Sequence, residues 1–140
     1  LTIGTGNNAV IMGRNTWESL NCNNLKYRKN IIISSKLTDN DNDIKVSSSL
    51  YNALKYCNDK EYDVAWIIGG SRIYDEALAI NNITGLYLTR VKTGVVCDTF
   101  FPHIDDSFCI NNIGDWQMEN GLNFRYEHYI NKAFRTQINF

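Results

Sequence analysis

The sequence predicts an α/β fold, with a mostly parallel central sheet, flanking helices and a C-terminal antiparallel hairpin. Short runs of β-branched and apolar residues alternate with segments of helical spacing up to residue 91. Such alternation is typical of parallel strands joined by right-handed helical crossovers. Two longer strand-like runs then follow at residues 108–113 and 124–130, with Gly121 in their connection. We expect these two runs to pair as the hairpin.

The predicted strands of the parallel sheet are short and rich in Ile and Val. The first ends at Gly13, and the third is weak and follows a polar loop over residues 38–43. In chain order the strands are expected at residues 9–12, 30–34, 44–46, 64–68 and 85–91.

Three helices are predicted between these strands. A short helix over residues 16–20 has Thr16 as its N-cap, and a second is capped by Ser48 or Ser49. In the second helix, apolar residues at 50, 53, 54 and 57 share one face. The third is expected over residues 71–79, with Ser71 as its N-cap.

Length and composition exclude several classes of protein. The 140 residues fit one domain spanning residues 1–140, and a hydrophobic content of 44% is globular. A net charge of -1 without a basic block gives no support for nucleic-acid binding. No apolar run is long enough to cross a membrane, and no signal peptide precedes Leu1. The four scattered cysteines predict no metal site and indicate a cytoplasmic protein with reduced thiols.

The strand at residues 64–68 runs directly into Gly69 and Gly70 and then into a helix. Two glycines at a strand end let a ligand approach the main chain. A helix N-terminus just beyond a strand favours an anionic group, usually phosphate. Taken alone, this pattern fits an unoccupied tight turn about equally well.

Polar groups follow three of the predicted strands. Because the carboxyl ends of parallel strands meet at one edge, these groups are expected together, where they favour a dinucleotide over simple turns. They are Arg14, Asn15 and Thr16; Ser34, Ser35 and Lys36; and Gly69, Gly70, Ser71 and Arg72.

Three further residues can either contact a ligand or have only a structural role. Arg28 can hold a carboxylate, but its spacing between Lys26 and Lys29 favours an ordinary surface arginine. Thr89 can face the ligand crevice or serve only as a strand residue. Tyr74 can cover a ligand ring or belong to the core.

The chain as a whole resembles the dihydrofolate reductase family. Five segments match family motifs in order, and together they span most of the chain. They are VIMGRNTWESL at residues 10–20, LKYRKNIIISS at 25–35, WIIGGSRIY at 66–74, LYLTR at 86–90 and DTFFP at 98–102. The resemblance implies a dihydrofolate reductase-like fold and NADPH-dependent reduction of 7,8-dihydrofolate to tetrahydrofolate, in support of one-carbon and thymidylate metabolism.

The resemblance also implies which residues bind the cofactor NADPH. Gly13, Arg14, Asn15 and Thr16 would hold its phosphates, and Ser34, Ser35 and Lys36 would surround the adenosine 2′-phosphate. Gly69 and Gly70 would be joined by a cis peptide bond. Ser71, Arg72 and Ile73 would lie at the pyrophosphate, and Tyr74 near the nicotinamide.

For the substrate, the resemblance implies that Ser19, Leu20 and Leu25 line the aminobenzoate pocket. Arg28 would hold the α-carboxylate of the folate glutamate, while Ile68 and Tyr74 would lie near the pterin. Thr89 would hydrogen-bond the catalytic carboxylate.

The chain also departs from the family pattern. The family's first strand, its mobile loop and its catalytic acid all lie before the equivalent of Leu1, so no catalytic acid is assigned in this sequence. The alternative is a non-catalytic remnant that binds NADPH and folate. Lys36 is expected to favour NADPH over NADH. Residues 133–140 are either a tail or a linker to a fused thymidylate synthase.

Overall fold

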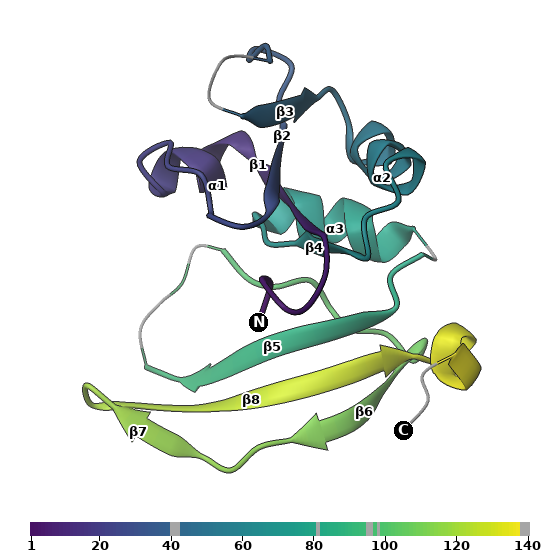
Figure 1. Cartoon of the computed structure of the whole chain (residues 1–140). Helices are drawn as coiled ribbons and strands as arrows, with labels where there is room; N and C mark the ends of the chain where they lie inside the picture. The colour runs from purple at the N-terminus through teal and green to yellow at the C-terminus, as the bar shows by residue number, and fades with distance from the viewer. Residues whose placement is uncertain (40–42, 81, 95–96, 98, 138–140) are drawn as a thin grey trace. The chain divides into compact units, whose positions relative to one another are not determined.

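The computed structural model describes residues 1–39, 43–80, 82–94, 97 and 99–137 (Figure 1). The chain divides into two compact units, Leu1–Ala79 and Ile80–Phe140, which we call unit 1 and unit 2. Among the described residues, no helix combines the length and apolar character needed to cross a membrane.

Unit 1 contains a four-stranded parallel sheet. Its strands are β1 (Asn8–Gly13), β2 (Lys29–Ile33), β3 (Ile44–Ser47) and β4 (Val64–Ile67), arranged in the order β3-β2-β1-β4. In the centre of the sheet, Ile11 lies opposite Ile31 on one side and Ile67 on the other. All four strands therefore end at the same edge, and the predicted parallel sheet is confirmed.

Three helices accompany this sheet: α1 (Arg14–Ser19), α2 (Leu50–Asp59) and α3 (Ser71–Ala79). Ser49 is the N-cap of α2, and its side chain accepts a hydrogen bond from the Asn52 N–H at 3.1 Å. The predicted N-caps Thr16 and Ser71 are wrong. Helix α1 already begins at Arg14, after the extended Gly13, and α3 begins at Ser71 itself, so both side chains belong to helical residues.

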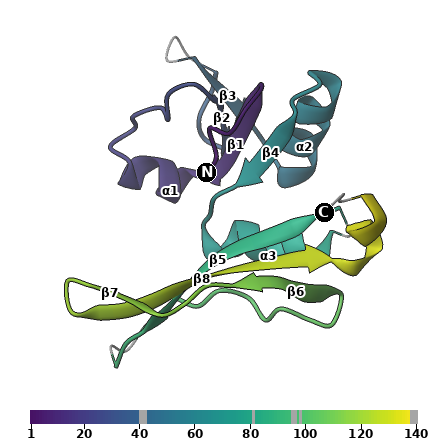
Figure 2. The same cartoon turned by 60° about the horizontal axis from the view of Figure 1, so that its bottom comes forward.

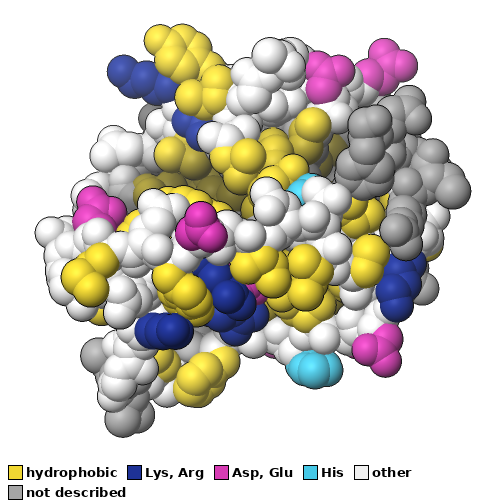
Figure 3. Space-filling view, turned by 90° about the horizontal axis from the view of Figure 1, so that it is seen from below, with side chains coloured by type: hydrophobic (Ala, Val, Ile, Leu, Met, Phe, Trp, Pro, Cys, Tyr) yellow, Lys and Arg dark blue, Asp and Glu magenta, His cyan; other side chains and the backbone are white. Residues whose placement is uncertain are grey.

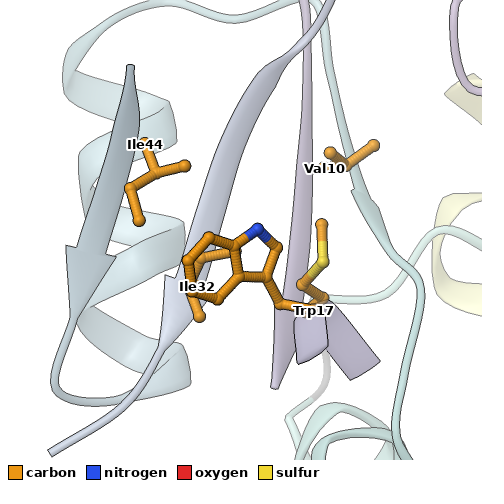
Figure 4. Packing of buried hydrophobic residues seen from close by; sticks show 5 residues of the cluster. Val10, Trp17, Ile32 and Ile44 are labelled. Carbon is orange, nitrogen blue, oxygen red and sulfur yellow. The ribbon is translucent and has the colours of Figure 1, made fainter. Parts of the chain in front are cut away.

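One face of the parallel sheet carries a buried apolar cluster. Val10 and Met12 of β1 meet Ile32 of β2 and Ile44 of β3, and Trp17 of α1 lies across them (Figure 4). The four β1 residues 9–12 are 0% exposed. A parallel sheet covered on both faces needs such continuous apolar strands, which is why these runs were recognisable in the sequence.

Strand β3 is the outermost strand on one side of the parallel sheet. The backbone on its outer side nevertheless makes a hydrogen bond. The backbone N–H of Val46 donates to the Asp39 carboxylate at 2.6 Å. The Lys45 ammonium donates to the same carboxylate at 3.0 Å, and both bonds lower the pKa of Asp39.

Unit 2 contains an antiparallel sheet followed by a short 3₁₀ helix, η1 (Lys132–Gln137). The sheet consists of β5 (Gly85–Lys92), β6 (Phe108–Ile113), β7 (Gln117–Glu119) and β8 (Leu122–Asn131). Strand β8 pairs with β5 on one side and with β6 and β7 on the other (Figure 2).

The expected antiparallel pairing of the two C-terminal runs is confirmed, because β6 and β8 are partners. The strand expected at residues 85–91 is present as β5, but its predicted place in the parallel sheet is wrong, because it pairs antiparallel with β8. The short strand β7 was not predicted. It joins β8 through Asn120 and Gly121, which have φ of 51° and 77°. Two positive φ values in succession suit the tight turn of a β-hairpin.

The centre of the unit 2 sheet contains a buried carboxylate. The Glu127 side chain is 0% exposed and accepts hydrogen bonds from Arg90 Nε at 2.8 Å, Arg125 Nε at 2.8 Å and the Tyr129 hydroxyl at 2.8 Å. A second bond from Arg90 Nη2, at 3.1 Å, makes that pair bidentate. These bonds, led by those from Arg90, lower the pKa of Glu127 from 4.5 to about 2.

Candidate functional site

The carboxyl ends of β1, β2 and β4 form one edge of the parallel sheet, and hydrogen bonds hold the segments that leave it. The Gly13 N–H donates to the Gly69 carbonyl at 2.9 Å, and the Ile68 N–H donates to the Ile11 carbonyl at 3.0 Å. The Ser34 N–H donates to the Ser47 carbonyl at 2.9 Å. The predicted convergence of strand ends is therefore present within unit 1.

Glycines form the centre of this edge, and the Gly69–Gly70 peptide bond is cis, as the resemblance implied. Gly69 has a φ of +128°, and a Cβ atom there would come within 3.3 Å of Thr16 Oγ1. A Cβ on Gly13 would lie 3.4 Å from the Ile73 side chain and 3.8 Å from the Gly69 carbonyl oxygen. We call Gly13, Thr16, Gly69, Gly70 and Ile73 the glycine edge, where backbone and one hydroxyl are closely packed.

Helix α3 starts at the glycine edge. The Tyr74 N–H donates to the Gly70 carbonyl at 3.0 Å, and Ser71 is half-buried in the first turn. The Arg72 side chain is 89% exposed and forms a 3.4 Å ion pair with Glu76. Tyr74 is half-buried, and this burial raises the pKa of its hydroxyl. The first turn of α3 thus combines backbone donors with an exposed positive charge.

Helix α1 supplies the second group of polar residues. Arg14 is partly exposed and forms a 3.3 Å ion pair with Glu18, while Asn15 is exposed. An exposed pair of this kind contributes little to stability, so the Arg14 guanidinium can exchange Glu18 for a ligand phosphate at small cost. Thr16 contributes its hydroxyl to the glycine edge directly.

The end of β2 supplies the third group. The Ser34 hydroxyl accepts hydrogen bonds from the N–H groups of Lys36 and Leu37, both at 3.1 Å. This local turn uses the Ser34 side chain, whereas Ser35 and Lys36 are exposed. Of the three residues, Ser35 and Lys36 are therefore better placed than Ser34 to reach a phosphate with their side chains.

Leu20, Leu25 and Ile68 are brought together, because all three pack against the cluster of Val10, Met12, Trp17, Ile32 and Ile44. Ser19 is exposed and its hydroxyl donates to the Thr16 carbonyl within α1. Trp17 was not among the predicted site residues, although it is the aromatic centre of this group. Its position three residues before Leu20 is the signal that could have indicated a shared helix face.

Arg28 and Thr89 are not part of the glycine edge. Arg28 precedes β2, at the opposite end of the strand from Ser34, and its guanidinium donates to Thr2 Oγ1 at 2.6 Å and to the Lys26 carbonyl at 2.9 Å. At about 3.3 Å per residue, β2 places Arg28 roughly 16 Å from that edge. Thr89 is an exposed residue of β5 in unit 2, opposite Tyr126.

The arrangement in unit 1 defines a class of protein. An α/β sheet that gathers glycine backbone, a hydroxyl and arginines at the carboxyl ends of its strands is typical of a nucleotide-binding domain.

Comparison with known proteins identifies the family. The family profile of dihydrofolate reductases matches residues 2–131, so the chain belongs to the dihydrofolate reductase family, which uses NADPH. The bifunctional dihydrofolate reductase-thymidylate synthase of Paramecium tetraurelia is 35% identical over 129 residues, covering 91% of this chain and 28% of that protein. The dihydrofolate reductase of Drosophila melanogaster is 36% identical, covering 88% of this chain and 73% of the relative. The dihydrofolate reductase of Sus scrofa is 37% identical, covering 87% of this chain and 73% of the relative.

Proposed function

We propose that the protein reduces 7,8-dihydrofolate to 5,6,7,8-tetrahydrofolate with NADPH. Membership of the dihydrofolate reductase family supports the reaction. The observation that carries the proposal in this chain is the glycine edge, where Gly13, Gly69 and Gly70 bring backbone and the Thr16 hydroxyl close together beside the start of α3.

In this proposal the donors around the glycine edge bind the cofactor. Thr16, Ser71 and the guanidinium groups of Arg14 and Arg72 neutralise the phosphates that join its two nucleosides, and Asn15 and Ile73 complete the contact. Ser35 and Lys36, with Ser34, hold the 2′-phosphate, where the charge of Lys36 favours NADPH over NADH. When bound, the cofactor supplies a hydride to the pterin ring.

The substrate would use the apolar side of the same unit. Leu20, Leu25 and Ile68 share one partly buried cluster, which suits the aromatic part of a folate, with Ser19 at its margin and Tyr74 near the pterin. Arg28 would hold the glutamate carboxylate in a bidentate pair. The distance of Arg28 from the glycine edge suits an elongated ligand that extends along the strand. Thr89 would support the catalytic acid, which we expect before Leu1.

We also propose a cytoplasmic location, on the basis of the scattered cysteines. A fused thymidylate synthase is a further proposal, since one relative of 35% identity carries both activities in its name. Reading the gene beyond the codon for Phe140 tests it. A stop codon directly after residue 140 would reject the fusion.

The glycine edge can be tested by adding a single methyl group. Gly69→Ala places a Cβ at a φ of +128° and 3.3 Å from Thr16 Oγ1. Such a backbone conformation costs a non-glycine residue about 1–3 kcal/mol. Because relief of this strain would shift the backbone of the glycine edge, we expect NADPH affinity to fall roughly tenfold or more. Affinity is measured by fluorescence titration. Gly94→Ala is the matched control, because a Cβ at Gly94 meets no atom within 4 Å. Unchanged affinity in Gly69→Ala would contradict the assignment.

Activity is tested on the full natural protein by following NADPH oxidation in the presence and absence of dihydrofolate. Dihydrofolate-dependent oxidation is the expected result. Tight NADPH binding without turnover would instead support the non-catalytic remnant, and absence of both would reject nucleotide binding as well.

A further inference from the structure

One face of the unit 2 sheet combines positive charge with exposed apolar side chains. Residues directly opposite one another in a sheet point to the same face. Arg90 lies opposite Arg125, Lys92 and Met118 lie opposite Asn123, and Ile113 lies opposite Glu127. We call Arg90, Lys92, Ile113, Trp116, Met118 and Arg125 the cationic face. Lys and Arg side chains beside hydrophobic ones are visible in the view from below (Figure 3).

Trp116 joins the charges of this face to its apolar part. The Lys92 ammonium lies 4.1 Å from the centroid of its ring, and the Arg125 guanidinium lies 4.7 Å from it. Trp116 remains 38% exposed, and Met118 is 71% exposed. Cations held over an indole ring keep their charge and remain available to an anion that approaches from solvent.

The carboxylate of this face is not available to a partner. Glu127 is fully buried beneath Arg90 and Arg125, and the donors of those residues and of Tyr129 already occupy it. It neutralises one positive charge of the three on Arg90, Lys92 and Arg125. The exposed part of the face is therefore positive even with Asp115 beside Trp116 in the chain.

We propose that the cationic face binds an extended acidic segment of another protein, with a carboxylate at every second position. Arg90 and Lys92 are two residues apart on one strand, so about 6.6 Å separates their positions. An extended peptide repeats its side chains on one side with the same spacing. Carboxylates at alternate positions can thus meet both cations, while the methylene groups of the same acidic side chains contact Trp116 and Met118.

The probe for this proposal is a short fluorescein-labelled peptide in which Glu alternates with Ser. Its binding to the full natural protein is followed by fluorescence anisotropy at low and at raised salt. We expect saturable binding that weakens with salt. Lys92→Glu reverses the charge beside Trp116 and should weaken binding about tenfold, as should removal of the ring in Trp116→Ala.

The matched control is Lys60→Glu, which makes the same change of charge at an exposed lysine of unit 1. It should leave peptide binding within about twofold of the wild type, since Lys60 is not a residue of the cationic face and single exposed charges act weakly at raised salt. Thermal unfolding identifies any variant that fails to fold. If one of Lys92→Glu and Trp116→Ala fails, the other is sufficient to test the cationic face.

Three results of the peptide assay would overturn the proposal. They are no binding of the Glu peptide, equal binding of a peptide with Lys in place of Glu, and loss of binding in Lys60→Glu equal to that in Lys92→Glu. Vesicles of phosphatidylserine distinguish a membrane from a protein partner. Binding to these vesicles without binding to the peptide would also overturn it. None of these readouts depends on reductase activity.

Discussion

The two units differ in what they bury at the centre of their sheets. In unit 1, Ile11, Ile31 and Ile32 are 0% exposed on adjacent parallel strands. In unit 2, the central strand β8 buries the carboxylate of Glu127 beneath Arg90 and Arg125. Unit 1 is thus stabilised mainly by removal of apolar surface from water, and unit 2 depends more on charge and hydrogen bonds.

The distribution of exposed apolar side chains shows the same difference. Among the described residues of unit 2, Ile130 is the single hydrophobic side chain that is fully buried. Several large ones are exposed, including Tyr87, Val91, Ile110 and Tyr126. Because burial of apolar area is the main favourable term in folding, we expect unit 2 to be more sensitive than unit 1 to changes in charge and pH.

The largest effect is expected in the core of unit 1. Ile32→Ala removes a 0% exposed side chain from the packed cluster and should lower the free energy of unfolding by about 2–5 kcal/mol, measured by urea denaturation. Tyr51→Ala, at a side chain that is 70% exposed on α2, is the control and should change it by less than about 0.5 kcal/mol. Equal effects would show that unit 1 does not depend on its apolar cluster.

An intermediate effect is expected in unit 2, and it depends on pH. The pKa of Glu127 falls from 4.5 to about 2 on folding, so its stabilisation is present above about pH 4.5 and is lost as the pH falls toward 2. Glu127→Gln should lower the free energy of unfolding by roughly 1.5–3 kcal/mol at neutral pH. The difference from the wild type should narrow in acid, as followed by urea denaturation at several pH values.

The control for this pH effect is Asp59→Asn, which breaks an exposed ion pair with Lys55 at 2.8 Å. Exposed pairs contribute little, so its stability should follow that of the wild type at every pH. A difference between Glu127→Gln and the wild type that stayed constant down to pH 2 would contradict the role of the charge.

The smallest effect is expected at the start of α2. Ser49→Ala removes the side chain that accepts from the Asn52 N–H and should lower the free energy of unfolding by about 1 kcal/mol. Ser48→Ala is a close control, because the Ser48 hydroxyl contacts the Asn52 side chain and caps no backbone group. If the two serines had equal effects in thermal unfolding, the assignment of the cap to Ser49 would be wrong.

The sequence was informative where local chemistry determines the structure. Apolar runs predicted β1, β2 and β4 to within a residue or two, and the Gly69-Gly70 pair marked the edge where the strand ends converge. The order of these segments along the chain was sufficient to place the polar residues of α1, β2 and α3 at one edge, because parallel strands share their direction.

The features that the sequence did not predict depend on contacts between distant segments. The strand β7 is three exposed residues long and has no apolar alternation of its own. The cluster around Glu127 requires the register of β5 against β8, which places Arg90 opposite Arg125 and cannot be read from either segment alone. The N-cap of α1 was displaced because β1 continues directly into the helix. That of α3 was displaced because the Gly70 carbonyl already accepts the hydrogen bond from the Tyr74 N–H.

The Asp39 side chain has a consequence for how molecules of this protein behave in a crowded solution. The outer edge of β3 would otherwise offer the Val46 N–H as a template for a strand of another molecule. The Asp39 carboxylate accepts a hydrogen bond from that N–H at 2.6 Å. It also binds the Lys45 ammonium, so a second charge lies beside the same strand. Two charged side chains therefore protect the outer side of β3 against edge-to-edge aggregation.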